Sequence, residues 1–224
     1  MRKVFCLINA LILTASLLFV PACSAKIDLT QNVVELRENV YQGQSKNYSL
    51  KAAYGFKTSK LEGSPAQTQK VFKLSFKLTE KETDDVTYTL KLVFNEQEYY
   101  AAFSFNPVAD CLTSSIEVEN FSLNEFAVTV CAGSQTEEVN MRSLLPEGTL
   151  TVQGALDFLI EKQPDLIESY KDENGAFAAQ IYARIMVKNE KAYWYIGFDR
   201  GQNNLKALLV DGQNGEILAI RDIF

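Results

Sequence analysis

The chain has 224 residues, with 28 acidic and 22 basic side chains, a formal net charge of −6 and no histidine. An acidic chain without a basic stripe is a poor candidate for binding nucleic acid or, unaided, an anionic membrane surface. The lack of histidine excludes Ser-His-Asp triads, Cys-His dyads and imidazole metal sites. The length allows one or two domains of ordinary size.

The first 22 residues have the layout of an export signal. Arg2 and Lys3 precede an apolar stretch from Val4 to Val20, which is short for a membrane-spanning helix. An uncleaved membrane anchor is the alternative. Cleavage after Ala22 removes two basic residues and no acid, so the net charge of the mature chain becomes −8. We predict that residues 1–22 are a signal peptide and that the mature chain is extracytoplasmic.

The end of this segment resembles the lipobox of bacterial lipoproteins. The run Val20-Pro21-Ala22-Cys23 puts a cysteine where these proteins carry the acylated residue that becomes the mature N-terminus. An ordinary signal peptidase would cut the same bond. The resemblance implies lipidation of Cys23 and a membrane anchor in a bacterial cell envelope. More than one acyl chain is then needed, because a single chain binds membranes only marginally. Residues 23–32 are interpreted as anchor and linker.

Two further cysteines remain in the mature chain, Cys111 and Cys131. Alternation of polar and apolar residues predicts strands near 112–118 and 126–130, joined by a turn around Phe121. In that register the two cysteines stand opposite each other, close enough for a disulfide. A disulfide also agrees with an oxidising compartment. We expect a Cys111–Cys131 bond, with two free thiols as the alternative.

Residues 33–147 carry the period-two pattern of β-strands. A strand is predicted over 72–78, and Asn95-Glu96 is predicted to be the turn of a hairpin. Residues 57–69, with glycine, serine and proline, are interpreted as an exposed loop. Six to eight short strands with one polar face predict two packed antiparallel sheets, an immunoglobulin-like β-sandwich over 33–147.

The hydrophobic period changes at Gly148. Thr151 is the predicted N-cap of a helix with one apolar stripe, and Pro164 predicts a break that opens a second short helix. Four strands separated by turn-forming residues follow, near 181–187, 192–198, 205–210 and 216–220. One helix region followed by an antiparallel meander predicts a small α+β unit, with the helix across the sheet.

The second of these strands contains Tyr193-Trp194-Tyr195. On a strand, Trp194 shares one face with Ile196 and Phe198, and that face is predicted to pack beneath the helix. Tyr193 and Tyr195 share the opposite face and are candidate partner-binding residues, since tyrosine favours recognition surfaces. Packing of that face against the preceding sandwich is the alternative.

The end of the chain resembles the PepSY domain, a small exported module. The helix beginning near Thr151, the strands after it and the terminal run Val210-Asp211-Gly212-Gln213-Asn214-Gly215-Glu216-Ile217-Leu218 carry the resemblance, over about residues 149–222. It implies binding or regulation of another exported protein, such as a protease, and transfers no catalytic residue. The predicted fold class is therefore α+β, with an N-terminal β-sandwich and a PepSY-like helix-plus-antiparallel-sheet domain over 148–224.

The sequence contains no nucleophile–base motif, no phosphate-binding glycine loop and no complete calcium loop. We predict a non-enzymatic protein without cofactor or metal ion, whose partner is an exported protein or peptide and not a nucleic acid. The first hypothesis is an envelope protein, lipid-anchored at Cys23, that binds or regulates another exported protein through its PepSY-like module. The second is a structural or ligand-binding lipoprotein whose β-sandwich binds a peptide or glycan.

Overall fold

The computed structural model describes residues 27–61, 64–78, 86–201 and 205–223. The predicted signal peptide, 1–22, and the predicted lipidation site, Cys23, lie outside the described residues. Within them the chain folds mainly as β-strands, with one 3-10 helix and two α-helices.

Thirteen strands form one hydrogen-bonded sheet in the described part of the chain. The helical segments are η1 (Leu29–Asn32), α2 (Val152–Lys162) and α3 (Pro164–Ser169). The strands are β1 (Val33–Gln44), β2 (Ser49–Leu61), β3 (Ser64–Leu78), β4 (Tyr88–Phe94), β5 (Gln97–Ala102), β6 (Ser104–Asn106), β7 (Cys111–Glu117), β8 (Glu125–Ala132), β9 (Gln135–Ser143), β10 (Gln180–Lys188), β11 (Lys191–Asp199), β12 (Leu205–Asp211) and β13 (Ile217–Ile223).

Strand β1 joins the two halves of the sheet. One edge of β1 pairs with β2 over nearly its whole length. The other edge pairs first with β10, in parallel, from Val33 to Arg37, and then with β9, antiparallel, from Tyr41 to Gly43. The sheet therefore forks at residues 38–40, where β9 and β10 separate.

The strands on one side of this fork close almost completely into a barrel. One path runs β1–β2–β3–β7–β6 and the other β1–β9–β8–β4–β5. Only Phe103 separates β5 from β6 along the chain, so the ends of the two paths are joined there.

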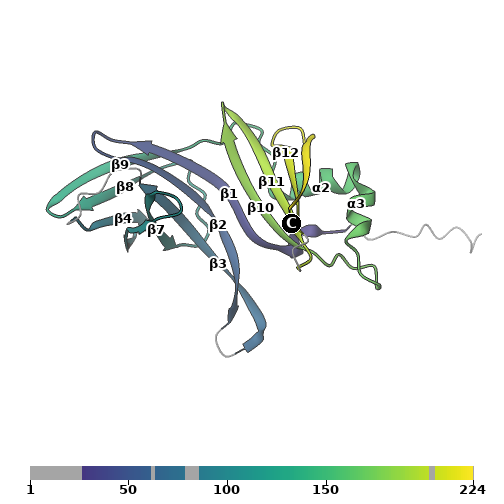
Figure 1. Ribbon diagram of the computed structural model, residues 1–224. Helices are drawn as coiled ribbons and strands as arrows, with labels where there is room; N and C mark the ends of the chain where they lie inside the picture. Colours follow the sequence, from purple (N-terminus) through teal and green to yellow (C-terminus); the bar gives the residue numbers. More distant parts are fainter. Residues whose placement is uncertain (1–26, 62–63, 79–85, 202–204, 224) are drawn as a thin grey trace, which may run out of the picture.

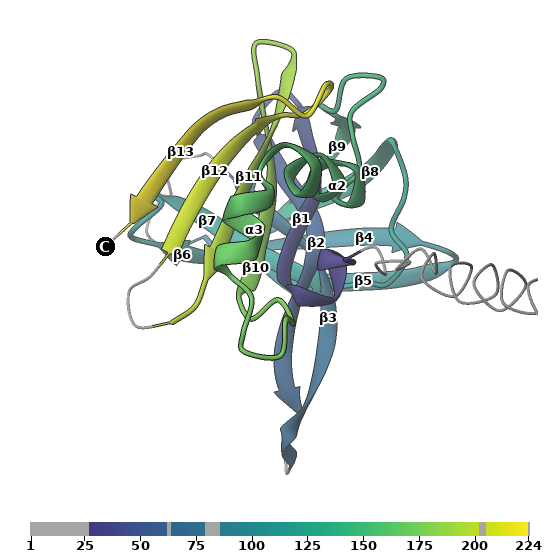
Figure 2. The ribbon, with the colours of Figure 1, turned by 90° about the vertical axis from the view of Figure 1, so that its right-hand side faces the viewer.

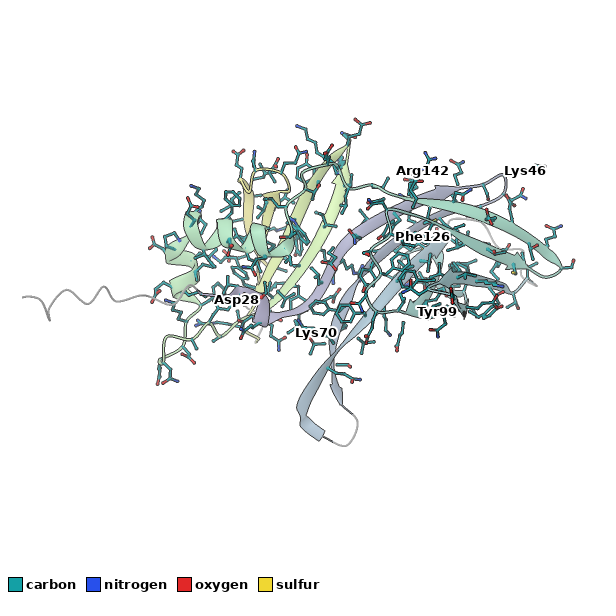
Figure 3. All side chains as sticks on the ribbon, turned by 180° about the vertical axis from the view of Figure 1, so that it is seen from behind. Asp28, Lys46, Lys70, Tyr99, Phe126 and Arg142 are labelled. Carbon is teal, nitrogen blue, oxygen red and sulfur yellow. The ribbon has the colours of Figure 1, made fainter. Side chains whose placement is uncertain are left out.

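Aromatic side chains fill the centre of the barrel. The ring of Phe121 lies 4.9 to 6.1 Å, between ring centroids, from Tyr41, Tyr54, Phe94 and Phe126. Figure 3 shows Phe126 among the side chains inside the barrel. These contacts form a continuous apolar core, the main source of stability for strands of this length.

A second core lies between the helices and the sheet β10–β13. Trp194 is buried there, and its Nε1 donates a hydrogen bond to the carbonyl oxygen of Leu150 at 3.0 Å. Both α-helices cover one face of this sheet (Figure 2). Leu29, Val33 and Leu36 from the start of the described chain belong to the same core. The C-terminal half is therefore completed by N-terminal residues.

The predicted fold class is wrong. The chain does not form a β-sandwich followed by a helix-plus-sheet domain. It is mostly β, and one continuous sheet, part of which closes almost completely into a barrel, spans both regions. The sandwich was predicted from the number of short strands with one polar face, which does not specify how the strands pair. In the structure β7 pairs with β3 and β6, β8 pairs with β4 and β9, and β1 pairs with β10. The sheet is thus continuous, through β1, across the boundary expected between residues 147 and 148.

The prediction of an exposed loop over 57–69 is also wrong. Strands β2 and β3 extend through most of this segment as a long hairpin below the body of the protein (Figure 1). In the described residues, 58–61 and 64–70 pair only with each other. The sequence from Lys57 to Gln69 is mostly polar and lacks the apolar alternation by which a strand is recognised.

Several local predictions are confirmed. The Thr151 side chain accepts a hydrogen bond from the Gly154 amide at 3.2 Å as the N-cap of α2, and Pro164 occupies the first turn of α3. Asn95 and Glu96, with φ of 50° and 63°, form the β4–β5 turn. Each of these features depends only on neighbouring residues.

A glycine permits the close approach of β1 and β2 beside the fork. Gly55 stands opposite Arg37, where the β1–β2 register shifts between Arg37 and Asn39. A Cβ atom at position 55 would lie 1.8 Å from the backbone oxygen of Leu36. Side chains larger than hydrogen are therefore excluded unless the two strands move apart.

We predict that Gly55→Ala lowers the free energy of unfolding by about 3 kcal/mol, because the new methyl group would overlap backbone atoms. Urea denaturation followed by circular dichroism measures this change. Gly154→Ala on α2 is the matched control, since its Cβ would meet only side-chain atoms at 3.4 Å or more and alanine favours helix by about 1 kcal/mol. Equal stability of the Gly55→Ala variant and the native protein would contradict this view of the fork.

Candidate functional site

The sheet face opposite the two α-helices carries the predicted partner-binding residues. Alternate residues of β10 and β11, such as Ile185 and Trp194, are buried against the helices, so the residues between them point the other way. We call this second surface the open face. It includes Glu35 and Arg37 of β1, Gly55 and Lys57 of β2, Val71, Lys73 and Ser75 of β3, Tyr182, Arg184 and Met186 of β10, Tyr193 and Tyr195 of β11, and Leu209 and Asp211 of β12.

The structure places Tyr193 and Tyr195 together on the open face, both half-buried. Tyr195 stands between Arg184 of β10 and Leu209 of β12, and Tyr193 stands opposite Met186. Met186 has an exposed fraction of 43%. The predicted arrangement, with Trp194 beneath the helices and the tyrosines opposite, is therefore confirmed. Their role in binding remains a prediction.

A charged cluster lies at the seam between β1 and β10. Glu35 has an exposed fraction of only 8%. Its Oε1 lies 2.9 Å from Nη2 of Arg184 and 3.3 Å from Nη2 of Arg37. A nearly buried carboxylate needs such partners, because removal from water is otherwise costly. One carboxylate oxygen therefore holds two guanidinium groups on the surface.

The two arginines retain capacity for a further acceptor. The side chains of Arg37 and Arg184 are 49% and 43% exposed. The Nε of Arg184 is buried and has no hydrogen-bond partner among the described residues. An unsatisfied buried donor costs about 1–3 kcal/mol, so an additional acceptor at Arg184 would stabilise the cluster.

A shallow depression of about 170 Å³ adjoins this cluster, lined in part by Arg37, Lys57 and Lys73. Lys73 also pairs with Glu117 at 3.1 Å. The depression is smaller than the roughly 300–1,000 Å³ of pockets that enclose small molecules. The geometry favours contact with the surface of a partner over enclosure of a ligand.

The cluster of Glu35, Arg37 and Arg184 was not predicted from the sequence. Glu35 and Arg37 are two residues apart and could be placed on one face of a strand. Arg184 reaches them only through the parallel β1–β10 pairing. No local sequence pattern predicts a parallel pairing between residues as distant in the chain as Arg37 and Arg184, so the cluster could be found only in the folded chain.

The predicted Cys111–Cys131 disulfide is absent, and both cysteines are free thiols in the structure. The predicted hairpin does not form, because Cys111 stands opposite Asn106 of β6 and Cys131 opposite Thr89 of β4. Phe121, expected in the turn, is buried in the barrel core. Burial of this aromatic ring directs β7 and β8 to different partners.

The described residues hold no group of three or more Cys, Asp or Glu side chains placed to bind a metal ion. None of the helices in that part of the chain is long and apolar enough to cross a membrane.

Comparisons with known proteins give no match. No protein-family model matches the chain, and no curated protein or solved structure matches it either.

Glu38 lies at the fork, near Tyr41 and Tyr54 of the barrel core, and its pKa is raised above 4.5 because burial disfavours the charged carboxylate. Burial, and then the charge of Glu38, raise the pKa of Tyr41 to about 12. Glu38 therefore binds its proton more tightly in the folded chain than in the unfolded chain. Its contribution to stability is largest at low pH and is lost as the pH rises through the folded pKa.

We predict that Glu38→Gln stabilises the protein at pH 7, because it removes a partly desolvated charge. The gain should stay below about 1 kcal/mol, since the carboxyl keeps some contact with water, and it should vanish below pH 4.5, where the native carboxyl is also neutral. Thermal unfolding from pH 4 to 8 measures it. Glu138→Gln, at an exposed position of β9, is the control. A gain that is independent of pH would contradict the role of charge.

Proposed function

We propose that the mature chain is a non-enzymatic binding protein of a bacterial cell envelope, lipid-anchored at Cys23, that holds another exported protein on its open face. One observation carries this proposal. Tyr193 and Tyr195 lie half-exposed beside Arg37 and Arg184, on the sheet face that the helices leave free. Tyrosine and arginine are the residue types most enriched, with tryptophan, at the energetic centres of protein interfaces.

The open face is rigid, which favours recognition. Its residues lie on hydrogen-bonded strands, and the opposite side of the same strands is fixed by the buried core around Trp194. Side chains held on a preformed surface lose little freedom when a partner binds. The only nearly buried acid of this face, Glu35, is already paired with two arginines, so its chemistry suits binding better than proton transfer.

The resemblance of residues 149–222 to the PepSY domain supports a regulatory partner, such as an exported protease. This segment does not form the open face alone. Glu35, Arg37 and Lys57 come from β1 and β2, and Leu36 belongs to the core beneath α2. We therefore infer that the partner contacts both halves of the chain, and binding experiments require the whole mature protein.

We predict that the double change Tyr193→Ala and Tyr195→Ala weakens capture of the natural partner from the cell envelope by more than about tenfold, the effect of losing aromatic interface residues. Affinity capture with the mature chain, followed by mass spectrometry, identifies and quantifies the partner. Tyr100→Ala is the matched control, because Tyr100 is 65% exposed but lies on the barrel. Equal loss in both variants, or no captured protein, would contradict the proposal.

We also predict that Cys23→Ala moves the protein from the membrane fraction to the soluble fraction. The change removes the sulfur to which the acyl chains would be attached. Mass spectrometry of the native N-terminus should detect two or three acyl chains on Cys23. An unmodified N-terminus would remove the anchor from the proposal while leaving the open face untouched.

A further inference from the structure

The charge of the open face is opposite to that of the chain as a whole. Four basic residues surround the seam of β1 and β10, accompanied by two acids, while the whole chain carries −6. These residues are Arg37, Lys57, Lys73, Arg184, Glu35 and Glu117. A local positive surface on an acidic protein attracts acidic partners and repels basic ones.

We propose that the open face recognises an acidic segment of its protein partner, with an Asp or Glu carboxylate seated against Arg184 and Arg37. This inference rests on the proposed function and names the chemistry of the partner. Arginine binds carboxylates through two parallel N–H donors. Glu35 contacts Nη2 of each arginine, and the buried Nε of Arg184 lacks an acceptor among the described residues. Because this Nε is buried, the proposal requires the 43% exposed side chain of Arg184 to rotate so that the donor meets the incoming carboxylate.

The occupant is a protein segment and not a free anion. Tyr193, Tyr195 and Met186 continue the surface from Arg184 across β10 and β11. A small anion would leave these partly exposed apolar groups in water. A polypeptide segment covers them with its own apolar side chains while its carboxylate reaches the arginines.

Glu35 has a second effect on binding. Its carboxylate competes with the partner for the same two guanidinium groups, so it weakens the attraction for a second negative charge. Glutamine at position 35 keeps an oxygen that can accept a hydrogen bond from Arg184, but it removes the competing charge. Opposite effects of changes at positions 35 and 184 therefore distinguish carboxylate recognition from a general loss of structure.

The test is a titration of the mature protein with a labelled eight-residue peptide in which Glu alternates with Ser and Leu. The comparison peptide has Gln in place of Glu. The native protein should bind the Glu peptide at least about tenfold more tightly than the Gln peptide, the value of a charge-assisted hydrogen bond. Arg184→Gln should abolish this preference, Arg184→Lys should retain part of it, and Glu35→Gln should increase the affinity for the Glu peptide severalfold.

The matched control is Arg142→Gln, which also breaks an arginine–glutamate pair. Arg142 is 75% exposed, lies 3.4 Å from Glu125 and projects from the outside of the barrel (Figure 3). It should bind both peptides as the native protein does. Thermal unfolding of each variant reports folding independently, and the nuclear magnetic resonance signal of the Arg184 Nε–H should shift with the Glu peptide.

The inference is overturned if both peptides bind equally, if Glu35→Gln and Arg184→Gln both weaken binding, or if Arg142→Gln acts like Arg184→Gln. Sulfate or glutarate binding as tightly as the Glu peptide would also overturn it, because the occupant would then be a free anion. If the tyrosine variants lose the natural partner but the native protein shows no preference for the Glu peptide, only the acidic character of the partner is wrong. If both experiments fail, the proposed function fails with it.

Discussion

The pairing of β1 with three other strands is the constraint on which the rest of the structure depends. β1 is bonded to β2 along one edge, and its other edge serves β10 and then β9. A strand has two edges, so β9 and β10 can share one only if they diverge. This divergence produces the fork and allows one strand to contribute to two cores. Beside the fork, β1 and β2 approach so closely that position 55 accommodates only glycine.

The same pairing creates the candidate site. Parallel alignment of β1 with β10 brings Glu35 and Arg37 beside Arg184, and the meander then adds Tyr193 and Tyr195 to the same face. Because the helices stabilise the opposite face, this surface is held rigid without being covered. Cationic and aromatic groups thus occur together on an otherwise acidic protein, a combination suited to holding an acidic partner from outside.

Features set by neighbouring residues could be predicted from the sequence, and features set by distant pairing could not. The Thr151 cap, the break at Pro164 and the face occupied by Tyr193 and Tyr195 follow from local chemistry. The sandwich was predicted from the number of short strands, and the disulfide from the pairing of two adjacent strands into a hairpin. Phe121 occupies the barrel core instead of a turn, and this separates the strands that carry the two cysteines. Burial of one aromatic ring therefore outweighed a plausible register.

Site-specific photo-crosslinking in the native cell envelope tests the central claim most directly. A photoreactive benzoyl-phenylalanine would replace Tyr195 on the open face in one protein and Phe105, which is 53% exposed on β6 of the barrel, in another. If the open face is the binding surface, position 195 should form a covalent adduct with one exported protein, and position 105 should form none. Adducts formed from position 105 but not from position 195 would contradict it.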